Sequence, residues 1–362
     1  MNKPLPLSQR GLSLIELMVA MLISLLLLGG VLQVFLSSKE LYQTNTAIAR
    51  LQEAGRFATE FITFDVRQAG FKGECLNEPT KHLSMNGLST DERNAYSTTP
   101  PIQGWDNSKP VIFSNGESTR AATDAFIVKY ASDGKEFQAQ GTNNIQTPSL
   151  GVSLANGDSQ GTGAYAGQLV ILANSTGCDT FQNANNASAS TFQKAGGNVT
   201  PGNINQDWSQ QYTNRLTSYI LRSHTYYIRN NTGRLPSLVR KSLTPSPHHE
   251  EMVEGVIDMQ VTYGLDRDGD RQADEYVKAG TNNLSATGEG DWTKVVSARI
   301  SLLVLSPETN ALEEPQVFAY PPASGITKED EFAIYDDGTV TIKNNRIAQA
   351  FTTTVAIRNR LP

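Results

Sequence analysis

The sequence predicts an α+β protein with a long N-terminal helix, transmembrane at first and then amphipathic, packed on a large antiparallel-sheet head. Three observations support this prediction. An apolar segment near the N-terminus continues without proline into an amphipathic one, segments of alternating polarity follow, and turn residues separate them. The length of 362 residues suits one large domain or two ordinary domains.

The composition excludes several classes of protein. Apolar residues make up 38% of the chain and charged residues 18%, so a folded core is feasible and global disorder is not expected. The net charge of -6 gives no electrostatic basis for wrapping nucleic acid, and no direct nucleic-acid binding is predicted. Four histidines and two cysteines are too few for zinc arrays, iron–sulfur clusters or a disulfide-dense fold.

The first predicted element is a membrane-spanning helix at residues 12–36. This segment contains a single charge, at Glu16, and about 20 apolar residues are enough to cross a bilayer as a helix. Lys3 and Arg10 precede it and no acidic residue does. The positive-inside rule therefore leaves the N-terminus in the cytoplasm and sends the rest of the chain across the membrane, in a single pass.

The helix is expected to continue beyond the membrane, to about residue 69. The apolar run is longer than the core of an ordinary secretory signal peptide, and residues 37–69 contain no proline. Two adjacent apolar rows follow helical spacing there: Leu41, Ile48, Leu51, Ala58 and Ile62, and Ala54, Phe57, Phe61 and Phe64. This half of the helix therefore has one face to place on a head, although Gly55 within it costs about 1 kcal/mol relative to alanine.

Residues 10–18, Arg-Gly-Leu-Ser-Leu-Ile-Glu-Leu-Met, resemble the type III signal of type IV pilins and pseudopilins. That signal is a short basic leader that ends in glycine and is followed by an apolar residue, with glutamate at the fifth mature position. The resemblance implies that prepilin peptidase cuts between Gly11 and Leu12 and methylates the new amine of Leu12. The implied divisions are a leader at 1–11, the pilin helix at 12–69 and a periplasmic or extracellular head at 70–362.

Glu16 occupies the fifth mature position. In the family this carboxylate pairs with the N-terminal amine of a neighbouring subunit, and opposite charges in a low-dielectric helix bundle attract strongly. An intramolecular pair with the amine of Leu12 is the alternative. The sequence departs from major pilins because the middle of its membrane helix lacks a proline, and Gly29 and Gly30 are the only weak points there.

The head is expected to be built from strands separated by polar loops. The candidate strands are residues 125–130, 168–173, 218–229, 237–243, 252–263, 295–305 and 351–358. Residues 138–163 and 174–206 are rich in Asn, Gly, Ser, Thr and Gln, and they are expected to form surface loops rather than core. His248 and His249 are placed in a solvated turn rather than at a metal site, because they follow Pro245 and Pro247.

The C-terminal third resembles the PilW family of minor pilins. The resemblance is carried by His-Thr-Tyr-Tyr-Ile-Arg at 224–229, Leu-Pro-Ser-Leu-Val-Arg at 235–240, Met-Val-Glu-Gly-Val at 252–256, Met-Gln-Val-Thr-Tyr-Gly at 259–264, Val-Ser-Ala-Arg-Ile-Ser-Leu-Leu at 296–303, and Phe-Thr-Thr-Thr-Val-Ala-Ile-Arg-Asn-Arg at 351–360. PilW-like proteins are similar to the J-type pseudopilin of type II secretion. Residues 75–215 carry no such resemblance.

The resemblance implies a structural protein, not an enzyme. It predicts a minor pilin that helps to initiate a type IV pilus and sits in the tip complex, supporting adhesion, motility or DNA uptake. The implied partners are other minor pilins, the major pilin, the inner-membrane assembly platform and prepilin peptidase. The head is expected in the periplasm before assembly and on the pilus afterwards. A J-like pseudopilin of type II secretion, or a tip adhesin using the 138–206 loops, is the alternative.

Cys75 and Cys178 are the only cysteines. The predicted topology places both in the periplasm, where disulfides persist. A bond between them would close a loop of about 100 residues and stabilise the head by roughly 4–5 kcal/mol in the chain-entropy model. Two unpaired thiols, too far apart to join, are the alternative.

A calcium site is predicted at residues 266–274. Carboxylates at the first, third, fifth and ninth positions resemble the ligand spacing of EF-hand and related loops, and the backbone carbonyl of the seventh residue adds a further oxygen. These ligands would be Asp266, Asp268, Asp270, Gln272 and Asp274. The glycine and glutamate that an EF-hand has at positions 6 and 12 are absent, so a plain charged hairpin is the alternative.

Overall fold

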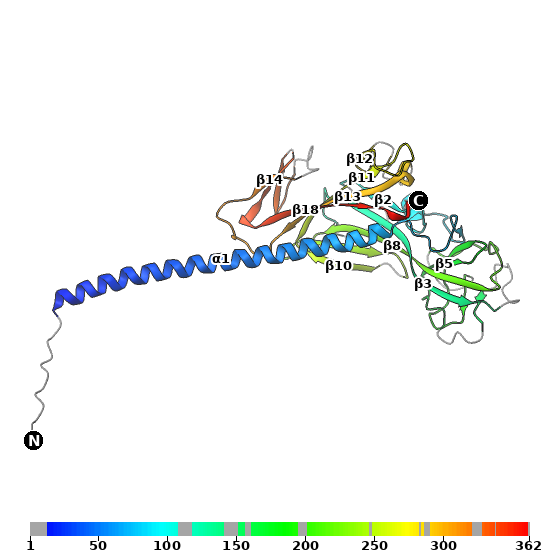
Figure 1. Ribbon diagram of the computed structural model, residues 1–362, viewed down its shortest axis with the longest axis horizontal. Coiled ribbons are helices and arrows are strands. Elements are labelled where there is room, and N and C mark those ends of the chain that lie inside the picture. Colours follow the sequence, from blue (N-terminus) through cyan, green and yellow to red (C-terminus); the bar gives the residue numbers. More distant parts are fainter. Residues whose placement is uncertain are drawn as a thin grey trace, which may run out of the picture.

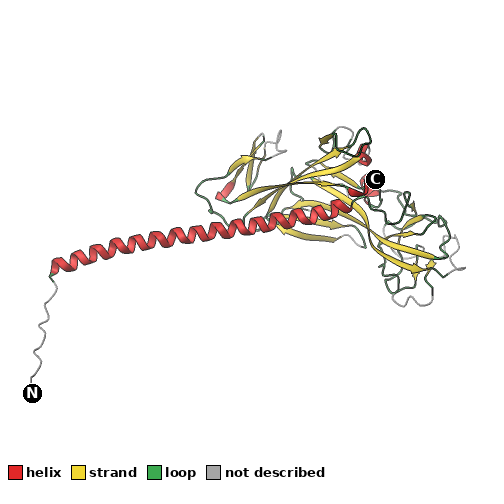
Figure 2. Cartoon of the chain, viewed as in Figure 1, coloured by secondary structure: helices red, strands yellow, loops and turns green. Residues whose placement is uncertain are grey.

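The computed structural model has one long helix that projects from a head made of several sheets (Figure 1). It describes residues 13–107, 118–140, 151–155, 161–194, 201–245, 248–281, 284–285, 290–320, 328–336 and 338–360. Figure 2 shows that strands and loops make up nearly all of the head. The predicted α+β class is confirmed.

Helix α1 spans Leu14–Gln68, or 55 residues, which corresponds to about 80 Å at the rise of an α-helix. Its second half packs on the head through a stripe of residues spaced by three or four: Ala47, Leu51, Gly55, Ala58, Ile62, Asp65 and Val66. Gly70 follows the helix with φ +79° and donates its N–H to the carbonyl of Lys129 at 2.9 Å. The predicted continuous helix is therefore confirmed from Leu14 to Gln68.

The largest sheet has eight strands, in the order β1-β6-β5-β8-β3-β2, and β9 and β10 extend it from β8. Its strands are β1 (Thr80–Lys81), β2 (Ile102–Trp105), β3 (Ala125–Gln138), β5 (Leu169–Ala173), β6 (Cys178–Gln182), β8 (Arg215–Arg229), β9 (Ser237–Ser242) and β10 (His248–Glu254). All pairs are antiparallel except β1 with β6. A turn at residues 230–233 joins β8 to β9.

A second sheet has the order β12-β11-β13-β18. Its strands are β11 (Val256–Leu265), β12 (Glu275–Val277), β13 (Val295–Leu305) and β18 (Ala348–Ala356). Helix α1 runs between β18 and β10, which belong to different sheets (Figure 1). The main hydrophobic core is shared by α1 and both sheets, and its members include Ile62, Phe126, Met259 and Ile300.

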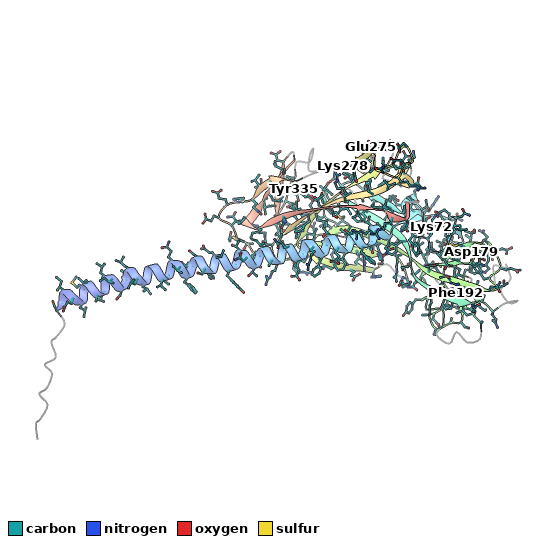
Figure 3. The ribbon with its side chains drawn as sticks, viewed as in Figure 1. Lys72, Asp179, Phe192, Glu275, Lys278 and Tyr335 are labelled. Atoms are coloured by element: carbon teal, nitrogen blue, oxygen red, sulfur yellow. A yellow bond between two sulfur atoms is a disulfide. The ribbon has the colours of Figure 1, made fainter. Side chains whose placement is uncertain are left out.

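Smaller elements complete the two ends of the head. Four strands form a separate sheet on one side of α1: β14 (Val317–Ala319), β15 (Lys328–Glu329), β16 (Ala333–Asp336) and β17 (Thr339–Ile342). A pair of short strands, β4 (Val152–Ser153) and β7 (Thr191–Phe192), lies in the opposite lobe, and α2 (Thr90–Ala95) precedes β2. Among the described residues, 3-10 turns lie at Asp291–Lys294, Lys343–Asn345 and Arg358–Arg360. Figure 3 shows Tyr335 in the sheet of β14 to β17, and it shows Asp179 and Phe192 in the lobe at the other end of the head, which carries β5, β6 and β7.

Three predictions about the head are wrong. The single strand expected at 252–263 is two strands, because Gly255 has φ +94° and breaks the chain between β10 and β11. His248 and His249 lie on β10, paired with β9, rather than in a turn. The described parts of 138–163 and 174–206 are not only surface loops, because Val152, Leu154, Phe181 and Phe192 are buried in a second hydrophobic core.

Candidate functional site

The first half of α1 is an apolar rod that the head does not cover. Every large apolar side chain from Leu14 to Leu36 is at least 50% exposed. Among the described residues, α1 is the one helix long and apolar enough to cross a membrane. So much exposed apolar surface has to be covered by lipid or by other apolar helices.

Glu16 lies in the first turn of α1 and closes its N-terminal end. The backbone N–H of Ser13, the N-cap residue, donates to Glu16 Oε2 at 3.0 Å. The carboxylate thus satisfies one backbone group that the helix leaves unpaired. Gly11 and Leu12, the predicted cleavage and methylation residues, lie outside the described residues. The amine that cleavage would create belongs to the residue directly before Ser13.

The second half of α1 is fastened to the head by a buried carboxylate, Asp65, which was not predicted from the sequence. Asp65 is 1% exposed and accepts hydrogen bonds from Tyr130 Oη at 2.7 Å and Tyr226 Oη at 2.6 Å. Tyr130 donates to Asp65 Oδ1 and Tyr226 to Asp65 Oδ2. His224 Nδ1 lies 2.7 Å from the same Oδ2, and a guanidinium nitrogen of Arg240 lies 3.7 Å from it. One side chain of α1 therefore engages β3, β8 and β9.

The partners of Asp65 also favour the ionised form of its carboxyl group. Burial by itself would raise the pKa of this carboxyl, but hydrogen bonds from His224, Tyr226 and Tyr130 and the charge of His224 outweigh burial, so the pKa is lowered. The sequence contains one indication of this role. Asp65 lies three residues after Ile62, so it falls on the same stripe of α1 that faces the head. A buried acid needs partners, but nothing local indicates which strands supply them.

The disulfide predicted from the two cysteines is present. Cys75 lies in the loop after α1 and Cys178 begins β6, and their Cα atoms are 5.8 Å apart. The bond spans a sequence separation of 103 residues. It ties the end of α1 to the lobe that carries β5 and β6.

A buried polar cluster reinforces the same lobe next to the disulfide. Asp179 and His82 are both 0% exposed, and His82 Nε2 lies 2.6 Å from Asp179 Oδ1. Tyr212 donates to Asp179 Oδ2 at 2.7 Å, and Ser209 Oγ donates to the same oxygen at 2.8 Å. Because His82 and Asp179 are 97 residues apart in the sequence, no local pattern marked this cluster.

The predicted calcium loop connects β11 to β12 and is stiffened by its own side chains. Asp266 accepts from the backbone N–H groups of Gly269 at 2.6 Å and Arg271 at 2.9 Å. Asp274 accepts from the N–H of Arg267 at 2.7 Å. Arg271, where an EF-hand has glycine, takes a left-handed conformation with φ +71°. The chain therefore curls at this position without a glycine.

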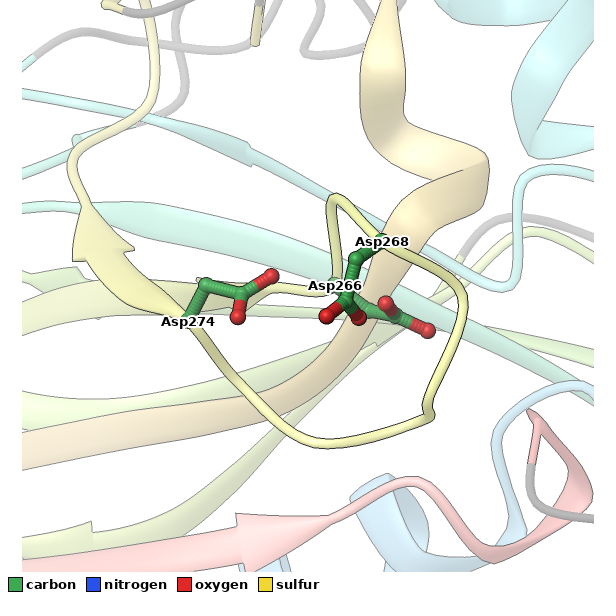
Figure 4. Close-up of side chains that lie close together, drawn as sticks. All are labelled: Asp266, Asp268 and Asp274. Carbon is green, nitrogen blue, oxygen red and sulfur yellow. The ribbon is translucent and has the colours of Figure 1, made fainter.

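The structure brings three of the five predicted ligands together. Carboxylate oxygens of Asp266, Asp268 and Asp274 lie within 4.8 Å of one another, and Figure 4 shows the three side chains converging within the loop. Asp270 instead accepts from the backbone N–H of Gln272 at 2.8 Å and from its side-chain amide at 3.2 Å. Three hard oxygen donors at this separation suit a cation such as calcium.

Two family models match the chain. Residues 225–359 match Type IV Pilus-assembly protein W, and residues 7–32 match the prokaryotic N-terminal methylation motif. A search of curated proteins and a search of solved structures each returned no match. The first match covers β9, β10, β11, β13 and β18, so it includes both strands between which α1 runs. The second covers α1 as far as residue 32 and the residues from 7 onward that precede the helix.

Proposed function

We propose that the chain is a PilW-like minor pilin of the type IV pilus, which helps to initiate the pilus and remains in the tip complex. In this proposal residues 12–36 hold the precursor in the inner membrane, with the head in the periplasm. Prepilin peptidase cuts after Gly11, and the mature chain leaves the membrane with other minor pilins, ahead of the major pilin. The head then lies at the cell surface.

The observation that carries the proposal is the contrast between the two halves of α1. The second half is fastened to the head by Asp65 and the core, while the first half exposes apolar side chains over its whole surface. Such a helix suits two environments in turn, lipid and then a bundle of similar helices, without a change in its own structure. Pilus assembly requires that exchange.

The processing step has a direct test. N-terminal sequencing of the chain from purified pili should begin with methylated Leu12, followed by Ser13 and Leu14. Replacing Gly11 with a bulky residue such as leucine should leave a full-length precursor in the membrane. An intact Met1 in assembled pili would contradict this part of the proposal.

The initiating role is tested by deleting the gene and counting surface pili. Loss of most pili, with recovery when the gene is supplied in trans, is expected for a subunit that starts assembly. Complementation with the Gly11→Leu precursor should not restore them. Normal piliation in the deletion strain would overturn the initiating role.

We also propose that the loop at 266–274 binds calcium through Asp266, Asp268 and Asp274. The closeness of the three carboxylates supports this, because without a cation they repel one another. Calcium would stiffen the connection between β11 and β12. It would have no part in catalysis.

A further inference from the structure

A groove of about 790 Å³ runs along the outer side of the head between α1 and β18, the two elements that lie side by side in Figure 1. Its helix side includes Arg56, Phe64 and Arg67, and its other side includes Thr352 and Arg358. Asn359 closes one end, because its side-chain amide donates to the carbonyls of Gln68 at 3.1 Å and Ala69 at 3.3 Å. The groove is therefore a fixed feature of the joint between helix and head.

The groove borders an open sheet edge. β18 pairs with β13 and with no other strand among the described residues, so alternate backbone N–H and C=O groups point away from the sheet. Successive side chains of a strand point to opposite faces, yet Phe351, Thr352 and Thr353 all line the groove. The groove therefore follows the edge itself.

This edge lacks the protection that exposed edges usually carry. β18 has nine residues, Ala-Gln-Ala-Phe-Thr-Thr-Thr-Val-Ala, with neither a charge nor a proline. The edge strand of the large sheet, β10, has the sequence His-His-Glu-Glu-Met-Val-Glu and carries charges along its length. Charges and prolines prevent unwanted pairing at an edge. Their absence from β18 indicates an edge that is available for pairing with another strand.

Arginines surround the groove and have no carboxylate partner. Arg56, Arg67 and Arg358 are exposed, and none of the three forms an ion pair with a residue that the structure describes. Glu60 is the one acidic residue in the lining. In a chain with a net charge of -6, this group of arginines without carboxylate partners is complementary to an acidic partner.

One exposed aromatic side chain, Phe64, lines the groove, and two more lie on the same flank of α1 outside its lining. Phe57 and Phe61 are each 40% exposed and Phe64 is 61% exposed, and the spacing of these three residues places them on one flank of α1. Exposed aromatic side chains beside arginines are typical of the centre of protein interfaces. A partner segment would therefore offer apolar side chains as well as carboxylates.

We propose that this groove takes an extended acidic segment of a neighbouring minor pilin, which pairs with β18 as an added strand. Its backbone would satisfy the open edge, and its carboxylates would lie on Arg56, Arg67 and Arg358. Segments that add to a sheet in this way gain affinity from the backbone and specificity from alternate side chains. The proposal rests on the minor-pilin function and specifies the chemistry of the partner.

Photo-crosslinking in the native cells tests the proposal with the full chain. p-Benzoylphenylalanine is placed at Thr352, in the groove, at Leu25, in the bare half of α1, and at Tyr165, which is 60% exposed and lies in the opposite lobe. The expected product at Thr352 is a crosslink to another minor pilin, mapped by mass spectrometry to an extended segment that contains carboxylates. Tyr165 should not capture this segment.

Charge reversal then tests the arginines. Arg67→Glu with Arg358→Glu should lower the Thr352 crosslink about tenfold, because unlike charges become like charges across the interface. The matched control reverses two exposed arginines elsewhere, Arg93→Glu with Arg215→Glu, and should leave the yield unchanged. Replacing the mapped carboxylates of the partner with arginine should restore the yield in the first variant. Unchanged melting temperatures show that both variants are folded.

The other outcomes overturn the proposal in distinguishable ways. Capture of pilins from Leu25 but not from Thr352 rejects the groove and leaves the minor-pilin function intact. A Thr352 product that maps to a second copy of this chain, to a helix or to a segment without carboxylates also rejects it. Equal loss of crosslinking in both double variants rejects the charge complementarity. Absence of pilins from both positions, together with normal piliation in the deletion strain, rejects the function as well.

Discussion

Gly55 of α1 lies against the ring of Phe351 on β18, so that a Cβ added to this glycine would stand 2.2 Å from Phe351 Cε2. The glycine that weakens the helix is thus what allows the strand to approach it. The close approach brings the two elements together beside the groove. Helix propensity and packing act in opposite directions at this position.

Gly55→Ala should destabilise the protein by about 1–3 kcal/mol, the usual cost of forcing extra volume into a packed site. Thermal unfolding of the full chain in detergent measures the effect. The control is Gly29→Ala, where an added Cβ meets nothing within 4 Å and where a gain from helix propensity is expected. In a double-mutant cycle, Phe351→Ala should remove most of the penalty at Gly55. Equal stability of the Gly55→Ala variant and the wild type would show that the ring moves aside freely.

Asp65→Asn should loosen α1 from the head. Removing the charge weakens three hydrogen bonds to a buried carboxylate, and charge-assisted bonds contribute about 1.5–3 kcal/mol each. The loss of stability at neutral pH should exceed that of Asp133→Asn, because the Asp133 side chain is 60% exposed and its ion pair with Arg222 lies at the surface. Urea unfolding followed by tyrosine and tryptophan fluorescence separates the two variants.

The same carboxylate predicts a pH dependence. Because the pKa of Asp65 is lower in the folded chain than in the unfolded chain, its ionised form contributes stability that is fully present above the unfolded pKa of about 3.9. That contribution is lost as the pH falls through the folded pKa. Stability should therefore fall less steeply below about pH 4 in Asp65→Asn than in the wild type. Parallel curves for the two proteins would contradict this role of Asp65.

Removal of the disulfide should destabilise the lobe that carries β5 and β6. Replacing Cys75 and Cys178 together with serine is expected to cost about 2–5 kcal/mol. Reductant should lower the melting temperature of the wild type but not of the double variant. Two alkylatable thiols in the unreduced wild type would show that the bond does not form in the cell.

Calcium should raise the melting temperature of the protein, and a chelator should reverse the rise. Ligand at a hundredfold excess over its Kd stabilises by about 2.7 kcal/mol. Asp268→Ala should abolish the response, whereas Asp270→Ala should largely keep it, because the Asp270 carboxylate bonds to Gln272 instead. Equal losses in both variants would favour the five-ligand set expected from the spacing. Absence of calcium binding in calorimetry would exclude the site.

Glu16→Ala should leave membrane insertion and cleavage intact, because it removes the only charge from the apolar segment. Its incorporation into pili should fall, since the pair with a neighbouring amine that the family resemblance implies would be lost. Immunoblots of membranes and of sheared pili separate these two steps. Glu40→Ala is the control, because Glu40 lies on the exposed surface of α1 beyond the apolar segment. Equal incorporation of both variants would exclude the pairing role.

The sequence alone determined the membrane segment, the continuous helix and most strands of the C-terminal third. These follow from local properties, namely the length of an apolar run, a spacing of three or four residues, and alternation along a strand. It also indicated the disulfide, because only one pairing of two cysteines exists. The acidic loop was recognised from the sequence because its carboxylates lie within nine residues of one another.

Tertiary structure decided which of these elements meet. Asp65 reaches Tyr226 across 161 residues, and Phe351 packs on Gly55, although neither partner has a local signal. Polar segments in the opposite lobe looked like loops because a short buried strand needs only a few apolar residues when its neighbours supply the rest of the core. The groove beside β18 is likewise invisible in the sequence. It exists because the strand edge, the arginines and Phe64 are placed together only when the C-terminal strand packs beside the N-terminal helix.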